Sequence, residues 1–149
     1  EMDDMYCAEN VVSAAADNAD SADQRQLVLI VEDNRDVREY ISMQLKDRYR
    51  LAMARDGKEG LRMATELVPD IIITDLMMPE MDGFEVLAMM NKYHWIDEVP
   101  VIMISAENAS SYVERAYDLG ATDYISRPFD MAVVRRRVIN TLMLYAKQQ

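Results

Sequence analysis

Short apolar runs alternate with longer segments of helical period from residue 27 to the end of the chain. Apolar runs of about five residues predict strands, and apolar residues three or four positions apart predict amphipathic helices. This alternation is typical of repeated strand and helix units that build a parallel α/β sheet. The predicted strands are residues 27–31, 49–54, 70–75, 100–105 and 121–126.

The third apolar run places three isoleucines, residues 71–73, on successive positions. A strand covered by helices on both faces has this continuous apolar sequence, so we expect it in the middle of the sheet. A final helix is predicted over residues 130–146, with Arg135, Arg136 and Arg137 on its solvated faces. The helical stripes predict core positions at Val37, Tyr40, Ile41, Leu45, Leu61, Met63, Leu67, Phe84, Leu87, Met90, Val134, Val138, Leu142 and Tyr145.

Negative charge is concentrated at the start of the chain. Residues 1–26 carry seven acids and one Arg, whereas residues 27–149 carry twenty acids and fifteen bases. Small, acidic residues have little to bury, so residues 1–26 are predicted to form a linker or weak helix. One domain is predicted over residues 27–146, and residues 147–149 are interpreted as a truncated tail of a longer protein.

Composition disfavours several classes of partner. The net charge of -11 disfavours a chain that coats nucleic acid or an anionic membrane. No apolar run approaches the roughly 20 residues of a membrane span. Cys7 is the single cysteine, so an internal disulfide is excluded and a cytoplasmic location is predicted.

The residues at the carboxyl ends of the predicted strands are candidates for a site, because an open parallel sheet binds its ligands there. These residues are Glu32 and Asp33 after the first strand, Asp75 at the end of the third, Ser105 and Ala106 after the fourth, and Arg127 and Pro128 after the fifth. Three carboxylates at one edge repel one another unless some are protonated or a cation binds. An oxygen-only donor set favours Mg2+, with Mn2+ as the other choice.

The loop after Asp75 contains residues that shape the backbone. Pro79 is predicted to fix a bend. Asp82 is predicted to cap the helix that begins at Gly83 and Phe84. These residues are structural whichever chemistry Asp75 performs.

Five motifs, in this order and spacing, resemble the receiver domains of bacterial two-component response regulators. They are Val31-Glu32-Asp33-Asn34, the D-x-x-M-P-x-M-D-G run from Asp75, Ser105-Ala106, Asp123-Tyr124 and Arg127-Pro128-Phe129. The resemblance covers residues 27–146. It implies a flavodoxin-like fold, with five parallel strands in the order 2-1-3-4-5 and helices on both faces.

The resemblance also implies a function. Asp75 would accept a phosphoryl group from a histidine kinase or a histidine phosphotransfer protein. Mg2+ would be held by Glu32, Asp33, Asp75 and the Met77 backbone carbonyl. Ser105, Ala106 and Arg127 would contact the phosphoryl group, and Tyr124 would change rotamer as the domain switches.

The same resemblance implies an output outside this domain and no free-standing enzyme activity. The output would be a further domain on a longer chain, or a homodimer through the fourth helix, fifth strand and fifth helix. Arg115, Asp123 and Arg135 would lie near that face. No direct contact with nucleic acid or membrane is expected.

Two other functions stay open at this stage. Arg127 stands where receivers usually carry Lys, and a degenerate receiver in which Arg127 pairs with Asp75 would be a constitutive protein-binding module. An α/β phosphohydrolase fits less well, since Met77 stands where a second Asp is expected. The four glycines, Gly57, Gly60, Gly83 and Gly120, form neither a dinucleotide-binding nor a P-loop pattern.

Overall fold

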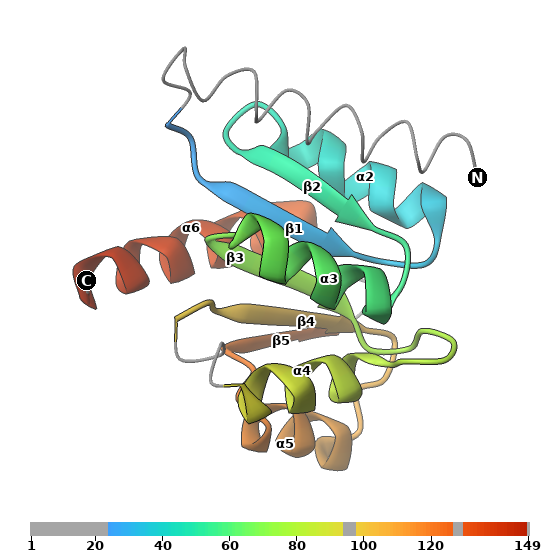
Figure 1. Cartoon of the computed structure of the whole chain (residues 1–149). Helices are drawn as coiled ribbons and strands as arrows, with labels where there is room; N and C mark the ends of the chain where they lie inside the picture. Colours follow the sequence, from blue (N-terminus) through green and yellow to red (C-terminus); the bar gives the residue numbers. More distant parts are fainter. Residues whose placement is uncertain (1–23, 94–97, 127–129, 149) are drawn as a thin grey trace.

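A computed structural model describes residues 24–93, 98–126 and 130–148 (Figure 1). Its five parallel strands form one sheet in the order β2-β1-β3-β4-β5. The predicted fold class and strand order are therefore confirmed. The strands are β1 (Leu27–Val31), β2 (Arg50–Ala54), β3 (Ile71–Asp75), β4 (Val101–Ser105) and β5 (Asp123–Ser126).

Helices cover both faces of this sheet, and α3, α4 and α5 lie on the opposite face from α2 and α6 (Figure 1). In the described part of the chain the helices are α2 (Arg35–Leu45), α3 (Gly57–Leu67), α4 (Gly83–Lys92), α5 (Ser110–Asp118) and α6 (Met131–Gln148). Successive residues of β1 point to opposite faces, so Val28 packs towards α2 and α6 while Leu29 packs towards the other helices. Each face of the sheet therefore has its own apolar core, which contains side chains from both strands and helices.

The predicted central strand lies in the middle of the sheet, where β3 pairs with β1 on one side and β4 on the other. Ile71, Ile72 and Ile73 are each exposed by 1% or less. Because both faces are buried, the strand has no polar alternation until Thr74 and Asp75. Asp75, at the carboxyl end of β3, therefore lies between the neighbouring strands β1 and β4.

The main differences from the predicted fold are the exposure of Tyr40 and the start of the fifth strand, while the second, third and fourth strands each begin one residue later than predicted. Tyr40 was predicted in the core and is 49% exposed, because the buried side of α2 is formed by Arg38, Ile41 and Leu45. The fifth strand begins at Asp123 rather than residue 121. The backbone is still closing α5 there, with Gly120 at a positive φ of 107° and the Ala121 amide donating to Ala116.

The ends of the domain are tied to the sheet in different ways. The Arg50 guanidinium donates to the Arg25 carbonyl at 2.7 Å, and the Arg50 amide donates to the Gln26 carbonyl at 2.9 Å. Residues 1–23, which make up most of the predicted linker, lie outside the described residues. None of the described helices is long and apolar enough to cross a membrane.

Val68 ends α3 in a backbone conformation that a β-branched residue rarely adopts, with a φ of 47° and a side chain 67% exposed. Val68→Gly should raise the free energy of unfolding by about 1 kcal/mol, since glycine accepts the left-handed conformation without steric cost. Urea denaturation measures the change. Val68→Ala keeps the conformational cost and is the control. A glycine variant no more stable than the alanine variant would contradict the expectation.

Candidate functional site

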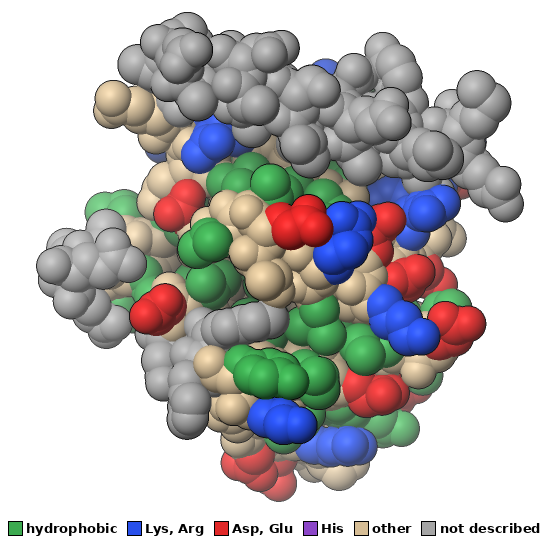
Figure 2. Space-filling view, viewed as in Figure 1, with side chains coloured by type: hydrophobic (Ala, Val, Ile, Leu, Met, Phe, Trp, Pro, Cys, Tyr) green, Lys and Arg blue, Asp and Glu red, His purple; other side chains and the backbone are tan. Residues whose placement is uncertain are grey.

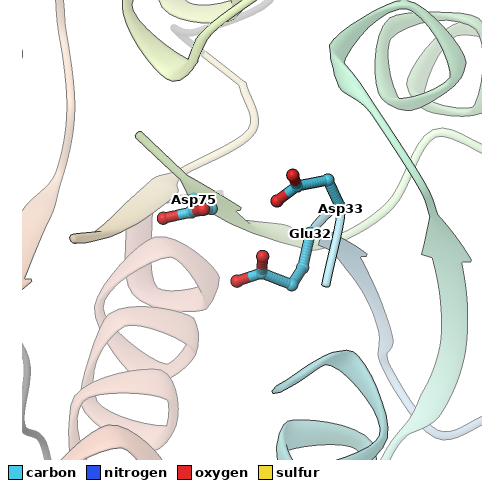
Figure 3. Close-up of side chains that lie close together, drawn as sticks. All are labelled: Glu32, Asp33 and Asp75. Atoms are coloured by element: carbon cyan, nitrogen blue, oxygen red, sulfur yellow. The ribbon is translucent and has the colours of Figure 1, made fainter. Parts of the chain in front are cut away.

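Three carboxylates meet at the carboxyl edge of the sheet (Figure 3). Glu32 and Asp33 follow β1, and Asp75 is the last residue of the adjacent strand β3. Carboxylate oxygens of the three side chains lie within 4.8 Å of one another. Glu32 is 1% exposed and Asp75 is 5% exposed, while Asp33 is exposed to solvent. The strand order thus brings together residues that are 42 positions apart.

The donor set suits a divalent cation that prefers oxygen ligands. Three carboxylates so close together repel one another when ionised, and burial of Glu32 and Asp75 strengthens that repulsion. A bound Mg2+ or Mn2+ would relieve it through direct carboxylate coordination. Because Asp33 is exposed, the cluster is open to solvent on one side, where an incoming group can reach Asp75.

The local backbone orients the Glu32 carboxylate. The Asn34 side chain caps α2 by accepting a hydrogen bond from the Val37 backbone amide. The backbone amide of Asn34 donates to Glu32 Oε2 at 3.1 Å. The turn between β1 and α2 is thereby fixed by both side chains. Glu32 is held towards the sheet edge rather than released into solvent.

Arg38 is a supporting residue that the sequence patterns missed. It is 2% exposed, and its guanidinium donates to the Glu32 carbonyl at 2.8 Å. Burial lowers the pKa of Arg38, and the charge of Glu59 acts in the opposite direction. Its position was visible in the sequence, because Arg38 lies three residues before Ile41 and seven before Leu45, on the same helical face.

The loop between Asp75 and α4 is closed by a close backbone approach. The Gly83 amide donates to the Leu76 carbonyl at 2.8 Å. A Cβ atom at Gly83 would lie 2.7 Å from the Asp75 carbonyl oxygen, so only glycine fits without displacing the backbone. The start of α4 is therefore packed directly against the backbone of Asp75.

The residues of this loop that were predicted to be structural are Pro79, Asp82 and Gly83. Asp82 caps α4 in a capping box, in which its side chain accepts from the Glu85 amide at 2.9 Å. The bend predicted at Pro79 is centred one residue later, at Glu80, which has a φ of 66°. The Met81 amide closes this turn by donating to the Pro79 carbonyl at 2.7 Å.

Ser105 and Tyr124 both contact the backbone of Glu107. Ser105 is fully buried at the end of β4, and its Oγ accepts from the Glu107 amide at 2.9 Å. Tyr124 is 8% exposed, and its hydroxyl donates to the Glu107 carbonyl at 2.6 Å. The sequence singled out both side chains but not Glu107, because a backbone contact leaves no trace in residue type.

The structure gives less information on the other candidate residues. Ala106 follows Ser105 and is exposed, and the Met77 side chain is 55% exposed two residues after Asp75. Arg127 and Pro128 lie outside the described residues, so their predicted contacts stay predictions. The roles assigned to these side chains from the sequence likewise stay predictions.

The face formed by α5, β5 and α6 contains ionic contacts within the chain. Arg137 donates to both carboxylate oxygens of Asp123, at 2.6 and 2.8 Å, and this hydrogen bonding raises the pKa of Arg137. Burial is the main cause that raises the pKa of the neighbouring Tyr117. Arg115 lies 4.2 Å from the centre of the Phe84 ring. Two residues predicted near this face are therefore engaged inside the chain.

Comparison with known proteins identifies the family. The sequence model of the response regulator receiver domain matches residues 28–139. This chain belongs to the response regulator receiver family. Response regulator RR06 of Streptococcus pneumoniae is 34% identical over 112 residues, which make up 74% of this chain and 50% of that protein.

Two further comparisons cover other settings of the receiver domain. The hybrid signal transduction histidine kinase D of Dictyostelium discoideum is 30% identical over 125 residues, 84% of this chain and 8% of that protein. The chemotaxis protein CheY4 of Vibrio cholerae has a TM-score of 0.73 at 28% identity, covering 78% of this chain and 98% of that chain. The chain spans 50% of the length of response regulator RR06 and 8% of the length of histidine kinase D.

Membership of the receiver family describes the domain as a signalling phosphoacceptor domain of two-component systems rather than a free-standing enzyme. The same domain occurs in response regulators and in hybrid histidine kinases. Receiver domains bind Mg2+ at an acidic pocket, and the acidic group at the sheet edge of this chain could hold a metal ion.

Arg38 donates a hydrogen bond to the Glu32 carbonyl beside the site, and its loss should affect stability and metal binding together. Arg38→Met should lower the free energy of unfolding by about 2 kcal/mol, because the Glu32 carbonyl loses a buried charged donor. Denaturant unfolding measures this loss. Arg35→Met, an exposed position on the same helix, is the control and should change stability by less than about 0.5 kcal/mol. Equal effects of the two substitutions would contradict the supporting role.

Proposed function

We propose that Asp75 accepts a phosphoryl group from the phosphohistidine of a histidine kinase or a histidine phosphotransfer protein. The observation that carries this proposal is the position of Asp75, at the end of β3, within 4.8 Å of two other carboxylates. Its near-complete burial, with Asp33 exposed beside it, gives one buried nucleophile at an accessible edge. The domain would then act as a switch whose state changes on phosphorylation.

The transfer is a direct exchange between two groups. A carboxylate oxygen of Asp75 would form a bond to phosphorus as the phosphorus–nitrogen bond to histidine breaks, and the electron pair returns to the imidazole. When bound, Mg2+ would neutralise the charge that spreads over the transferring oxygens. Glu32, Asp33 and Asp75 would hold the ion, together with the Met77 carbonyl. Positioning and electrostatics supply most of the acceleration.

The Ser105 hydroxyl has the capacity to bind the phosphoryl group without losing its present partner. A serine hydroxyl has one donor and two acceptor positions, and one acceptor position is taken by the Glu107 amide. The donor would therefore be available for a phosphoryl oxygen. Movement of Ser105 would then carry the Glu107 backbone with it, and this backbone also holds the Tyr124 hydroxyl.

This connection suggests how phosphorylation would reach the surface. Tyr124 bonds to the same residue as Ser105, so a shift of the loop after β4 changes the position of the Tyr124 ring. Arg127 would complete the site by neutralising the phosphoryl group through paired hydrogen bonds. The readout would pass to an output domain of a longer chain, or to a homodimer through α5, β5 and α6.

Phosphorylation of Asp75 is testable with a small phosphodonor. Incubation of the chain with acetyl phosphate and Mg2+ should add the mass of one phosphoryl group, measured on the intact protein. Asp75→Asn should abolish the addition, because the amide is not a nucleophile for this transfer. Asp36→Asn, an exposed acid on α2, is the control and should leave the addition intact.

Two further outcomes separate the proposed switch from a constitutive binding module. Arg127→Lys should also be phosphorylated, since both side chains carry the required positive charge. Absence of any mass gain in the unaltered chain and in Arg127→Lys would contradict the proposed phosphoacceptor. A mass gain in Arg127→Lys but not in the unaltered chain would favour the degenerate receiver in which Arg127 pairs with Asp75.

Metal binding is tested separately by calorimetric titration with Mg2+. Asp33→Asn should weaken binding at least about tenfold, because it removes a charged oxygen from the cluster. Asp36→Asn is again the matched control, because it makes the same chemical change at an exposed acid outside the cluster. Equal affinities for the two variants would show that the three carboxylates do not form the metal site.

A further inference from the structure

Arginines line a groove beside α6. One cavity of about 450 Å3 is lined by Arg48, Ala132, Arg135, Arg136 and Ile139. A second cavity of about 440 Å3 adjoins it, sharing Arg48 and Ile139, and is also lined by Gln24, Arg25, Gln26, Tyr49, Leu142 and Met143. We name this the Arg48–α6 groove. Its floor follows α6 for roughly 16 Å, at 1.5 Å for each residue from Ala132 to Met143.

The groove has an unbalanced charge. Among the residues that the structure describes, no Asp or Glu lines either cavity. Within the described ranges, Arg48, Arg135 and Arg136 form no ion pair. Elsewhere the charges are mixed, and Figure 2 shows acidic and basic side chains interspersed over the face that carries α3 and α4. Three arginines without a carboxylate partner, on a chain of net charge -11, favour an anionic occupant.

The shape and lining of the groove favour a peptide over an extended polyanion. Its apolar floor, formed by Ile139, Leu142 and Met143, offers contacts for small aliphatic side chains beside the arginines. Nucleic acid or an anionic membrane would face the remaining negative charge of the domain as well. A short segment with both acidic and small apolar residues matches the two parts of the lining.

The sequence of residues 1–23 has that composition. It contains seven acids and no Lys or Arg, and most of its apolar residues are alanine and valine. Residue 23 is bonded to Gln24, which itself lines the groove. A tethered segment reaches an effective concentration in the millimolar range, so weak contacts suffice to hold it.

We propose that the acidic segment of residues 1–23 binds in the Arg48–α6 groove of its own domain. Carboxylates of the segment pair with Arg48, Arg135 and Arg136, and its small apolar residues lie over Ile139 and Leu142. Bound there, the segment covers the middle of α6 and neutralises its arginines. The proposal does not depend on phosphorylation of Asp75.

Cys7, the single cysteine, lies within the segment and allows the full chain to be tested. A nitroxide attached to Cys7 of nitrogen-15-labelled protein should broaden the backbone amide signals of residues 132–143 and leave those of α3 and α4 sharp. Reduction of the nitroxide provides the reference spectrum. Raising the salt to about 1 M should remove most of the broadening, because the screening length falls to roughly 3 Å.

A matched pair of triple variants tests the role of the arginines. Substitution of Arg48, Arg135 and Arg136 by Gln should lower the ratio of bound to unbound segment on the order of tenfold, since three surface ion pairs are lost. Lys58→Gln, Arg62→Gln and Lys92→Gln change the net charge equally at exposed positions outside the groove and should preserve the broadening.

Three results would overturn the proposal. The first is an absence of broadening along α6 in the unaltered chain. The second is an equal loss of broadening in both triple variants, which would indicate a general charge effect. The third is broadening that appears only when nitroxide-labelled and nitrogen-15-labelled chains are mixed, which would assign the groove to a second copy.

Discussion

Repulsion among the carboxylates at the edge of the sheet is the constraint on which the rest of this structure depends. Glu32 and Asp75 are almost completely buried, and their oxygens lie within 4.8 Å of each other and of Asp33. Such a cluster is unfavourable when fully ionised unless a cation balances it. The same imbalance that costs stability makes the cluster a group that could hold a divalent ion.

Hydrogen bonds that involve backbone atoms help to hold this cluster in place. Arg38 donates to the Glu32 carbonyl from beneath the site, and the Asn34 amide holds the Glu32 carboxylate. On the other side, Gly83 allows the start of α4 to approach the Asp75 carbonyl more closely than any side chain would permit. Rigid elements on both sides keep the oxygens together despite their repulsion.

The loop after β4 connects the site to the helices around β5. The Ser105 hydroxyl accepts a hydrogen bond from the backbone amide of Glu107, and the Tyr124 hydroxyl donates one to the backbone carbonyl of the same residue. Beyond this loop, the face formed by α5, β5 and α6 is held by the Arg137–Asp123 ion pair and by Arg115 over the Phe84 ring. A displacement at the site would therefore act on a connected set of contacts, from the loop after β4 to the helices around β5.

The sequence by itself determined the parallel sheet and the residues at its carboxyl edge, and its resemblance to receiver domains implied the strand order. Continuous apolar runs such as Ile71-Ile72-Ile73 are possible only for strands buried on both faces, and parallel strands bring their following residues to one edge. Local capping was also encoded, because Asp82 and Glu85 form their capping box within one helical turn.

Only the tertiary structure decided which residues support the site. Arg38 is buried while Tyr40 is exposed, and this choice depends on how α2 is rotated against the sheet. The contacts of Ser105 and Tyr124 with Glu107 involve backbone atoms that every residue possesses, so no sequence pattern distinguishes them. The arginines of the Arg48–α6 groove come from separate segments, and their charges become one feature only when folding brings those segments together.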